Sequence, residues 1–263
     1  MECPFCFVPF DAETTSARAV RDAFSATLAN LQPTSITIGG GDPLMFRDLD
    51  SILEIARERT EFVQLDTNAK ALGRNRITVL RNYVDLLGLP LESARADIHD
   101  RLRAEDGHFD RVFRAIRDAV EISLPVKINT VLTAENRSGV AQLGSLIQAS
   151  GAVRWSLYEF WNMEPVPGPP SRFAIEYSRF LSAIEEARQA APNVRVETGS
   201  SVSARKASYV FVRHTGGVYV ISQKDHRKYI ELGSIFEIDI RDRILAHFNR
   251  AQQKARLRER MGQ

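Results

Sequence analysis

Short apolar runs alternate with amphipathic segments along most of this chain, and this alternation constrains its fold more than any other feature. Strand-sized runs are predicted over residues 35–38, 62–66, 84–91, 126–132 and 155–161, and helices over 13–31, 47–59, 70–81, 109–122 and 137–150. Strands that alternate with helices pair in parallel through right-handed crossovers. The sequence therefore predicts an α/β fold, either a curved or partial (β/α) barrel or an open doubly wound sheet.

A proline-rich segment follows the last of these strands. Residues 162–170 contain four prolines and a glycine, which neither a helix nor a sheet tolerates. Beyond it the pattern predicts a helix near 172–190, short strands near 194–197, 208–213 and 217–222, and a helix near 239–260. We expect a core domain over residues 1–161, and a lid loop, a helix and a small α+β C-terminal extension over residues 162–263.

Composition excludes some classes of partner. The chain has 263 residues and a formal net charge of +2, so no global charge demands a nucleic acid or a membrane surface. No apolar run approaches the roughly 20 residues of a membrane span. The first residues also lack the basic and apolar regions of a signal peptide. We expect a cytoplasmic protein with no membrane partner. Basic residues in the tail could dock phosphate or nucleic acid, but a solvated face is the simpler interpretation, which argues against nucleic acid.

The two cysteines of the sequence lie three positions apart, in Cys3-Pro4-Phe5-Cys6. Two cysteines this close cannot close a long loop, so a metal or redox role is favoured over a stabilising disulfide. Thiol–disulfide enzymes, zinc half-sites and iron–sulfur sites all use this spacing. The five histidines are scattered and show no ligand spacing, so the motif alone leaves these three roles open.

A glycine turn directly follows the predicted strand at 35–38. Gly39, Gly40, Gly41 and Asp42 lie at its end. Glycines there allow a ligand to approach the backbone, and a carboxylate accepts hydrogen bonds from an ammonium group. A plain strand-to-helix turn is the alternative.

With these two motifs in this order, the chain resembles the radical S-adenosylmethionine (SAM) superfamily, including viperin-like and molybdenum-cofactor-cyclase-like members. That family holds a [4Fe–4S] cluster with cysteines spaced C-x3-C-x2-C and binds the SAM amino group with a Gly-Gly-Glu-Pro-like turn. The resemblance covers residues 1–161 and implies a partial (β/α)6 TIM-like barrel that lacks its first strand. It implies Cys3 and Cys6 as cluster ligands and Phe5 beside the adenine. The glycine turn, with Asp42 in place of glutamate, would bind SAM.

Polar residues at the ends of later strands are softer candidates. The resemblance implies further cofactor-binding roles for Asp66, Asn68, Glu92, Ser93 and Asn129. Those that follow the strands ending near 66 and 91 would hydrogen-bond the ribose or the SAM carboxylate, with helix capping as the alternative. Lys127 and Asn129 share one face of their strand, which indicates the barrel lumen, or else an edge strand. Aromatic residues over 155–161 would form a wall of the substrate cavity, or else pack in the core.

The sequence departs from the family at its first cysteine, which would fall four places before Cys3 and so before Met1. We expect the protein to begin upstream, with Met1 as an internal methionine; a degenerate member without a cluster is the alternative. The predicted function is a radical SAM enzyme that cleaves SAM reductively and abstracts hydrogen from a small-molecule or peptide substrate. Its electron donor would be a flavodoxin or ferredoxin. A cluster-free, catalytically inactive binding protein on the same fold is the second hypothesis, and a thiol redox protein is the third.

Overall fold

The computed structural model describes residues 3–6, 15–161, 172–199, 209–222 and 228–247. Contacts divide the chain into two units. The first comprises Met1–Pro9, Thr37–Phe46 and Gln64–Gly199, and the second comprises Phe10–Ile36, Arg47–Val63 and Ser200–Gln263. No helix in the described ranges is long and apolar enough to span a membrane.

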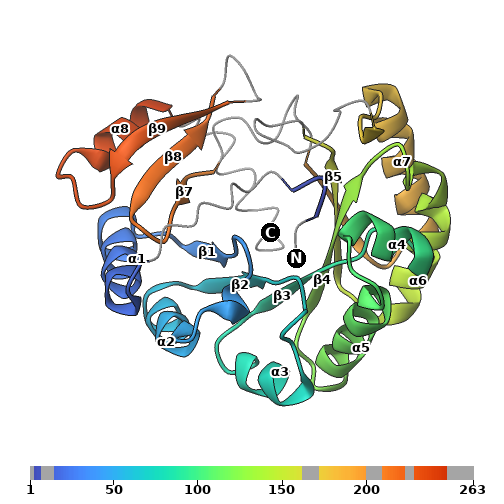
Figure 1. The fold of residues 1–263 in the computed structure, drawn as a ribbon, viewed down its shortest axis with the longest axis horizontal. Helices are drawn as coiled ribbons and strands as arrows, with labels where there is room; N and C mark the ends of the chain where they lie inside the picture. Colours follow the sequence, from blue (N-terminus) through green and yellow to red (C-terminus); the bar gives the residue numbers. More distant parts are fainter. Residues whose placement is uncertain (1–2, 7–14, 162–171, 200–208, 223–227, 248–263) are drawn as a thin grey trace. The chain divides into compact units, whose positions relative to one another are not determined.

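The described strands of the main sheet lie in chain order, β1-β2-β3-β4-β5-β6 (Figure 1). Their bounds are β1 Ser35–Ile38, β2 Phe62–Asp66, β3 Leu86–Pro90, β4 Val126–Leu132, β5 Arg154–Glu159 and β6 Arg195–Gly199. Parallel ladders join each neighbouring pair from β2 to β6. A doubly wound sheet reverses its strand order at a switch point. The order of these strands does not reverse, so the doubly wound alternative is excluded and the predicted α/β class is confirmed.

Helices connect the successive strands. Their bounds are η1 Pro43–Met45, α2 Leu49–Arg59, α3 Arg74–Leu80, α4 Ala96–Arg103, α5 His108–Glu121, η2 Arg137–Gly139, α6 Val140–Ser150 and α7 Tyr177–Ala190. The sequence analysis did not predict α4. Its buried residues are His99 and Leu102, and most of its other positions are charged, so its apolar period is too short to read as a helix.

The two faces of the main sheet differ in polarity within the first unit. Ile128 and Trp155 are paired in register and fully buried. They lie on the face that α6 and α7 cover (Figure 1), because a Cβ atom at Gly144 of α6 would come within 3.2 Å of the Trp155 ring. On the other face, Lys127 is paired with Arg154 and Asn129 with Ser156. Paired residues of parallel strands point to the same face, so this face is polar. Because β4 lies between β3 and β5, the edge-strand interpretation of Lys127 and Asn129 is wrong.

The parallel array includes one more strand than the sequence analysis predicted for it. The strand expected near 194–197, in the C-terminal extension, is β6, and it pairs in parallel with β5 from Arg154–Arg195 to Tyr158–Gly199. The helix α7 provides the crossover between these strands, as α6 does between β4 and β5. The proline-rich segment at 162–170, proposed as a lid, lies outside the described residues.

The second unit contains α1 Ala17–Leu31, α2 and a smaller antiparallel sheet. The described strands of that sheet, β7 Phe211–Val212, β8 Gly217–Ile221 and β9 Tyr229–Ser234, are followed by α8 Ile240–His247. The hairpin predicted at 214–217 joins β7 to β8, with Gly216 at φ 91°. A buried apolar cluster holds the unit together and comprises Ala23, Val218, Val220, Leu232, Ile235, Ile240 and Ile244. Much of the basic tail, including all of 248–263, lies outside the described residues.

Candidate functional site

Cys3 and Cys6 lie in a tight turn of the first unit. The backbone N–H of Cys6 donates to the carbonyl of Cys3 at 2.9 Å, and both thiols are free and half-buried. The Cys3 thiol donates to the carbonyl oxygen of Arg103 at 3.7 Å. Burial raises the pKa of the Cys3 thiol, and the nearby Arg103 cation opposes that rise. Among the described residues, no group of three His, Cys, Asp or Glu side chains forms a metal site.

Phe5, the predicted neighbour of the adenine, lies between the two cysteines in the sequence, and its side chain is buried. It packs in an apolar cluster with Leu102, Phe160 and Phe173, and its ring meets that of Phe173 edge-on at 6.2 Å. The guanidinium carbon of Arg103 lies 5.8 Å from the centre of the Phe5 ring. This packing anchors the cysteine turn to the core of the unit, and the contact of Phe5 with adenine stays a prediction.

The Asp42 carboxylate has two oxygens in different states. Its Oδ1 accepts the backbone N–H of Leu44 at 3.1 Å and the hydroxyl of Thr67 at 2.8 Å. Its Oδ2 is buried and has no hydrogen-bond partner among the described residues. Burial raises the pKa of Asp42, whereas the hydrogen bonds from Thr67 and Leu44 lower it. Buried polar atoms are nearly always hydrogen-bonded, so an oxygen in this state indicates a missing donor.

The glycine turn beside Asp42 is open. Gly40 has φ +124°, a conformation that residues with a Cβ rarely adopt. A Cβ atom at Gly40 or Gly41 would meet nothing within 4 Å. The backbone here is therefore accessible to a ligand, whereas a Cβ at Gly39 would make ordinary contact with Asp66.

Asp66 and Asn129 lie on either side of Gly88, on the polar face of the sheet. A Cβ atom at Gly88 would overlap the Asp66 carboxylate and come within 3.0 Å of the Asn129 amide nitrogen. The Tyr158 hydroxyl donates to Asn129 Oδ1 at 3.4 Å and accepts from Lys127 Nζ at 3.2 Å. The structure thus brings two predicted residues together and adds Lys127 and Tyr158 to them.

Asn68 and Ser93, also predicted to bind the cofactor, have side chains that cap turns. Asn68 Oδ1 accepts the backbone N–H of Lys70 at 2.8 Å, and Ser93 Oγ accepts that of Arg95 at 3.1 Å. These are local side-chain-to-backbone turns and not the helix caps of the alternative interpretation, because the N-cap residues of α3 and α4 are Gly73 and Arg95. A cofactor role for either residue stays a prediction.

Glu92 is fully engaged within the protein. Its Oε1 forms an ion pair with Arg103 at 3.2 Å, and its Oε2 accepts the backbone N–H of Val131 at 2.8 Å. Its side chain is 1% exposed, and burial raises its pKa to about 7, against the lowering effect of Arg103. Arg103 Nε is also buried and has no hydrogen-bond partner among the described residues. Glu92 therefore links β3 to α4 and β4 in this structure, and its contact with SAM stays a prediction.

His99 and His108 form a pair that the sequence analysis missed. The two rings are parallel within 3°, and His99 Nε2 lies 2.7 Å from His108 Nδ1. At one end, the backbone N–H of Glu92 donates to His99 Nδ1 at 3.0 Å. At the other, His108 Nε2 lies 2.7 Å from the carbonyl oxygen of Asn68. The two histidines are nine positions apart in the sequence and lie on different helices, so their spacing matches no pattern that predicts a pair.

The described aromatic residues over 155–161 differ in their packing, and a role in the wall of a substrate cavity stays a prediction. Trp155 is fully buried, and its Nε1 donates to Thr130 Oγ1 at 2.9 Å, so it belongs to the core. Phe160 packs against Phe173. Tyr158 is the described aromatic of this strand that reaches the polar face.

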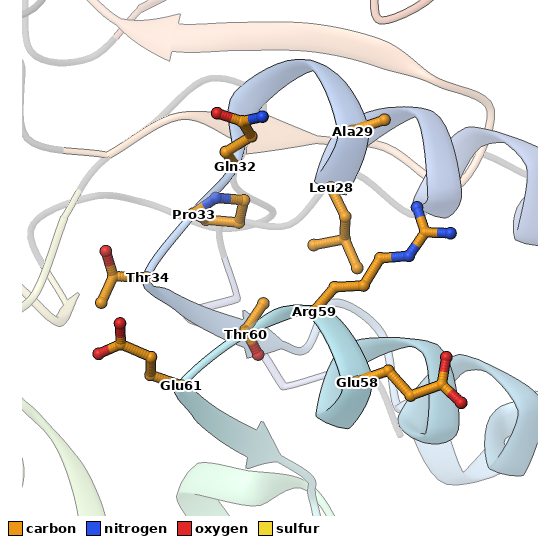
Figure 2. Close-up of a pocket in the computed structure, with 9 residues that line it drawn as sticks. All are labelled: Leu28, Ala29, Gln32, Pro33, Thr34, Glu58, Arg59, Thr60 and Glu61. Atoms are coloured by element: carbon orange, nitrogen blue, oxygen red, sulfur yellow. The ribbon is translucent and has the colours of Figure 1, made fainter.

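A separate surface hollow of about 620 Å³ lies in the second unit, at the C-terminal ends of α1 and α2 (Figure 2). It is lined by Leu28, Ala29, Gln32, Pro33, Thr34, Glu58, Arg59, Thr60 and Glu61. Thr34 and Glu61 precede β1 and β2, whereas the predicted site residues follow these strands. The hollow therefore contains none of the predicted site residues.

The comparison with protein families identifies the chain as a member of the radical SAM superfamily, because the sequence profile of that superfamily matches residues 1–146. The PqqA peptide cyclase of Granulibacter bethesdensis is 22% identical over 74% of this chain and 54% of its own length. The AdoMet-dependent heme synthase of Oleidesulfovibrio alaskensis is 24% identical over 57% of this chain and 38% of its own length. The chain thus spans about half or less of these curated relatives.

Solved structures share the fold. Streptococcus suis SuiB bound to the precursor peptide SuiA matches 96% of this chain and 63% of its own, with a TM-score of 0.73 and 14% identity. The anSMEcpe protein with bound AdoMet matches 97% of this chain and 78% of its own, with a TM-score of 0.71 and 15% identity. These matches confirm the predicted partial TIM-like (β/α) architecture.

Proposed function

We propose that this chain is the core of a radical SAM enzyme that binds SAM at the carboxyl ends of β1, β2 and β3. Through reductive cleavage of SAM, the enzyme abstracts a hydrogen atom from a peptide or a small molecule. Membership of the superfamily and the fold shared with AdoMet-bound structures support this chemistry. The residues that follow β1 and β2 support the position of the site.

The observation that carries the proposal is the state of Asp42. One carboxylate oxygen is held by Thr67 and Leu44, and the other is buried without a partner among the described residues. The α-ammonium group of SAM supplies both the missing donor and the opposite charge, and such charge-assisted hydrogen bonds are the strong ones. The open backbone at Gly40 and Gly41 leaves room for the rest of the amino-acid part of SAM.

Cys3 and Cys6 fit two thiolate positions of a [4Fe–4S] cluster, because both are free and share one tight turn. The sequence contains two cysteines, so this chain contributes two thiolates. The cluster, when bound, supplies the electron for SAM cleavage, which it receives from a donor such as flavodoxin or ferredoxin. Phe5 fixes the turn in the core, and the Arg103 cation beside Cys3 favours its thiolate.

The substrate class is supported by the relatives. A peptide substrate agrees with the resemblance to PqqA peptide cyclases and to SuiB, which was solved with its precursor peptide. A small-molecule substrate agrees with the resemblance to AdoMet-dependent heme synthases.

The test measures 5′-deoxyadenosine from anaerobically purified protein that has been reconstituted with iron and sulfide, reduced with dithionite and given SAM. We expect product from the wild type and about 10- to 150-fold weaker SAM binding by Asp42→Asn, which removes a charge-assisted hydrogen bond of about 1.5–3 kcal/mol. Asp97→Asn, at an exposed carboxylate paired with Arg95, is the matched control and should behave as the wild type. Equal SAM binding by Asp42→Asn and Asp97→Asn would contradict the assignment of the site.

The second candidate is a cluster-free binding protein on the same fold, in which Cys3 and Cys6 remain free thiols. It predicts that the reconstituted protein retains no iron and that Cys3→Ala leaves SAM binding unchanged. SAM binding without iron or product would support this candidate. The absence of both SAM binding and product would contradict the two candidates together.

A further inference from the structure

We propose that His99 and His108 are positioning residues. Their hydrogen bonds hold the loop after β2 at a fixed position relative to the loop after β3, and this keeps the Asp42 carboxylate oriented towards its ligand. The identity of that ligand as SAM rests on the proposed function. The positioning role itself depends only on hydrogen bonds within this chain.

The direction of every hydrogen bond in this pair is set by its two backbone ends. The N–H of Glu92 can only donate, so His99 Nδ1 accepts and His99 Nε2 carries the proton. His99 Nε2 then donates to His108 Nδ1, and His108 Nε2 donates to the carbonyl of Asn68, which can only accept. Each ring is therefore neutral and has a single tautomer.

The pair continues a path of hydrogen bonds across the carboxyl ends of neighbouring strands. The Asn68 carbonyl that His108 holds is one residue from Thr67, whose hydroxyl donates to Asp42 Oδ1. The backbone N–H of Thr67 donates to the carbonyl of Gly88 at 3.1 Å. At the other end, Glu92 accepts the N–H of Val131 in β4. One connected path thus runs from the turn after β1 to β4, and the two histidines join its Asn68 and Glu92 ends.

Burial makes this bridge rigid. Both histidines are fully buried, at 0% exposure, and His99 also packs edge-on against the Phe109 ring at 5.9 Å. The charged groups that face the pair are Asp100 and Arg103 on α4 and Arg111 on α5. Asp100 accepts the N–H groups of Gly107 and Phe109 and so holds the start of α5, which carries His108.

The experiment compares His108→Leu with His108→Gln. Leucine removes the donor to Asn68, whereas the glutamine amide supplies a donor at the position of Nε2. The first readout needs no ligand: in ¹⁵N-labelled protein, the amide resonance of Leu44, which donates to Asp42, should shift in His108→Leu and return towards the wild-type position in His108→Gln. A loss of stability alone would not produce this rescue.

The second readout is the affinity for SAM in the iron-reconstituted protein. We expect about tenfold weaker binding for His108→Leu and recovery to within about threefold of the wild type for His108→Gln, as one hydrogen bond would account for. An unmoved Leu44 resonance in His108→Leu, or equal shifts in both variants, would overturn the positioning role. If the wild type binds no SAM, but the Leu44 resonance shifts in His108→Leu and returns in His108→Gln, the proposed function is contradicted and the positioning role is upheld.

Discussion

Gly88 of β3 leaves the space that the Asp66 carboxylate of β2 occupies, because a Cβ atom at position 88 would overlap that carboxylate. The two residues are direct partners in the parallel ladder, so the missing side chain of one makes room for the other. Asp66 Oδ1 accepts from Gln64 Nε2 at 2.7 Å in this position.

We predict that Gly88→Ala displaces Asp66 and destabilises the protein by about 1–3 kcal/mol, as overpacking of a well-packed site does. Gly73→Ala is the matched control, because a Cβ atom there meets nothing within 4 Å and the φ of −98° suits any residue. Urea unfolding of the three proteins measures the difference. Similar unfolding midpoints for the two variants would show that Asp66 moves without cost.

Two substitutions in the glycine turn should distinguish an effect on stability, caused by backbone strain, from an effect on SAM affinity. Gly40→Ala should cost about 1–2 kcal/mol of stability, because alanine must adopt the φ of +124° that Gly40 has. Gly41→Ala has no such strain, so its stability should match the wild type while its affinity for SAM falls. Thermal unfolding and equilibrium dialysis with SAM distinguish the two. Unchanged SAM binding by Gly41→Ala would show that the ligand does not approach this backbone.

The histidine pair should make the protein sensitive to acid. Burial lowers the pKa of His99 to about 2 and that of His108 to about 4, below the unfolded value of about 6.5. The stability from the neutral rings is therefore present above pH 6.5 and lost as the pH falls below it. Each ring contributes about 2 kcal/mol to the change between pH 7.5 and pH 5.

The raised pKa of Glu92 acts in the opposite sense, since its contribution is lost as the pH rises from about 4.5 through about 7. The difference between wild type and His108→Gln isolates the histidine effect. We expect the stability advantage of the wild type over this variant to shrink by about 2 kcal/mol between pH 7.5 and pH 5. A constant difference across this range would mean that His108 titrates with the same pKa in the folded and the unfolded protein, which would contradict the prediction.

The Glu92–Arg103 ion pair should show strong coupling. The two side chains are 1% and 12% exposed, and removal of one partner leaves the other charge buried. We expect Glu92→Leu and Arg103→Met each to cost about 3–5 kcal/mol, and the double variant to cost less than their sum. The exposed pair Arg95–Asp97 serves as the control and should show no measurable coupling. Additive losses for Glu92 and Arg103 in urea unfolding would contradict the prediction.

The strands of the main sheet and most of the helices could be predicted because their apolar patterns are clear. The strand β9 could not be predicted, because Leu232 is its single buried residue. The helix α4 could not, since its buried residues are His99 and Leu102 alone. Without α4, the contacts of His99 and Arg103 in the candidate site could not be predicted, because α4 carries both residues. The sequence places His99 and His108 nine residues apart, and only the turn between α4 and α5 brings their rings together.

The glycine turn and the cysteines could be found from sequence because their chemistry depends on residue type and spacing. Roles that depend on contacts could not. Glu92 follows a strand, as a ligand-binding carboxylate would, but only its partners Arg103 and Val131 reveal that both of its oxygens are engaged. Asn68 likewise contributes its carbonyl group to the histidine pair, which no side-chain pattern predicts.

The path through His99 and His108 ends on main-chain atoms at both Asn68 and Glu92. Any amino acid at position 68, and any except proline at position 92, offers the same carbonyl or N–H group. The two terminal hydrogen bonds of the bridge therefore do not depend on the side chains at its ends. The side chain of Glu92 is constrained separately by its ion pair with Arg103. The side chain at position 68 can thus change by mutation while the main-chain atoms that help to hold Asp42 are inherited unchanged.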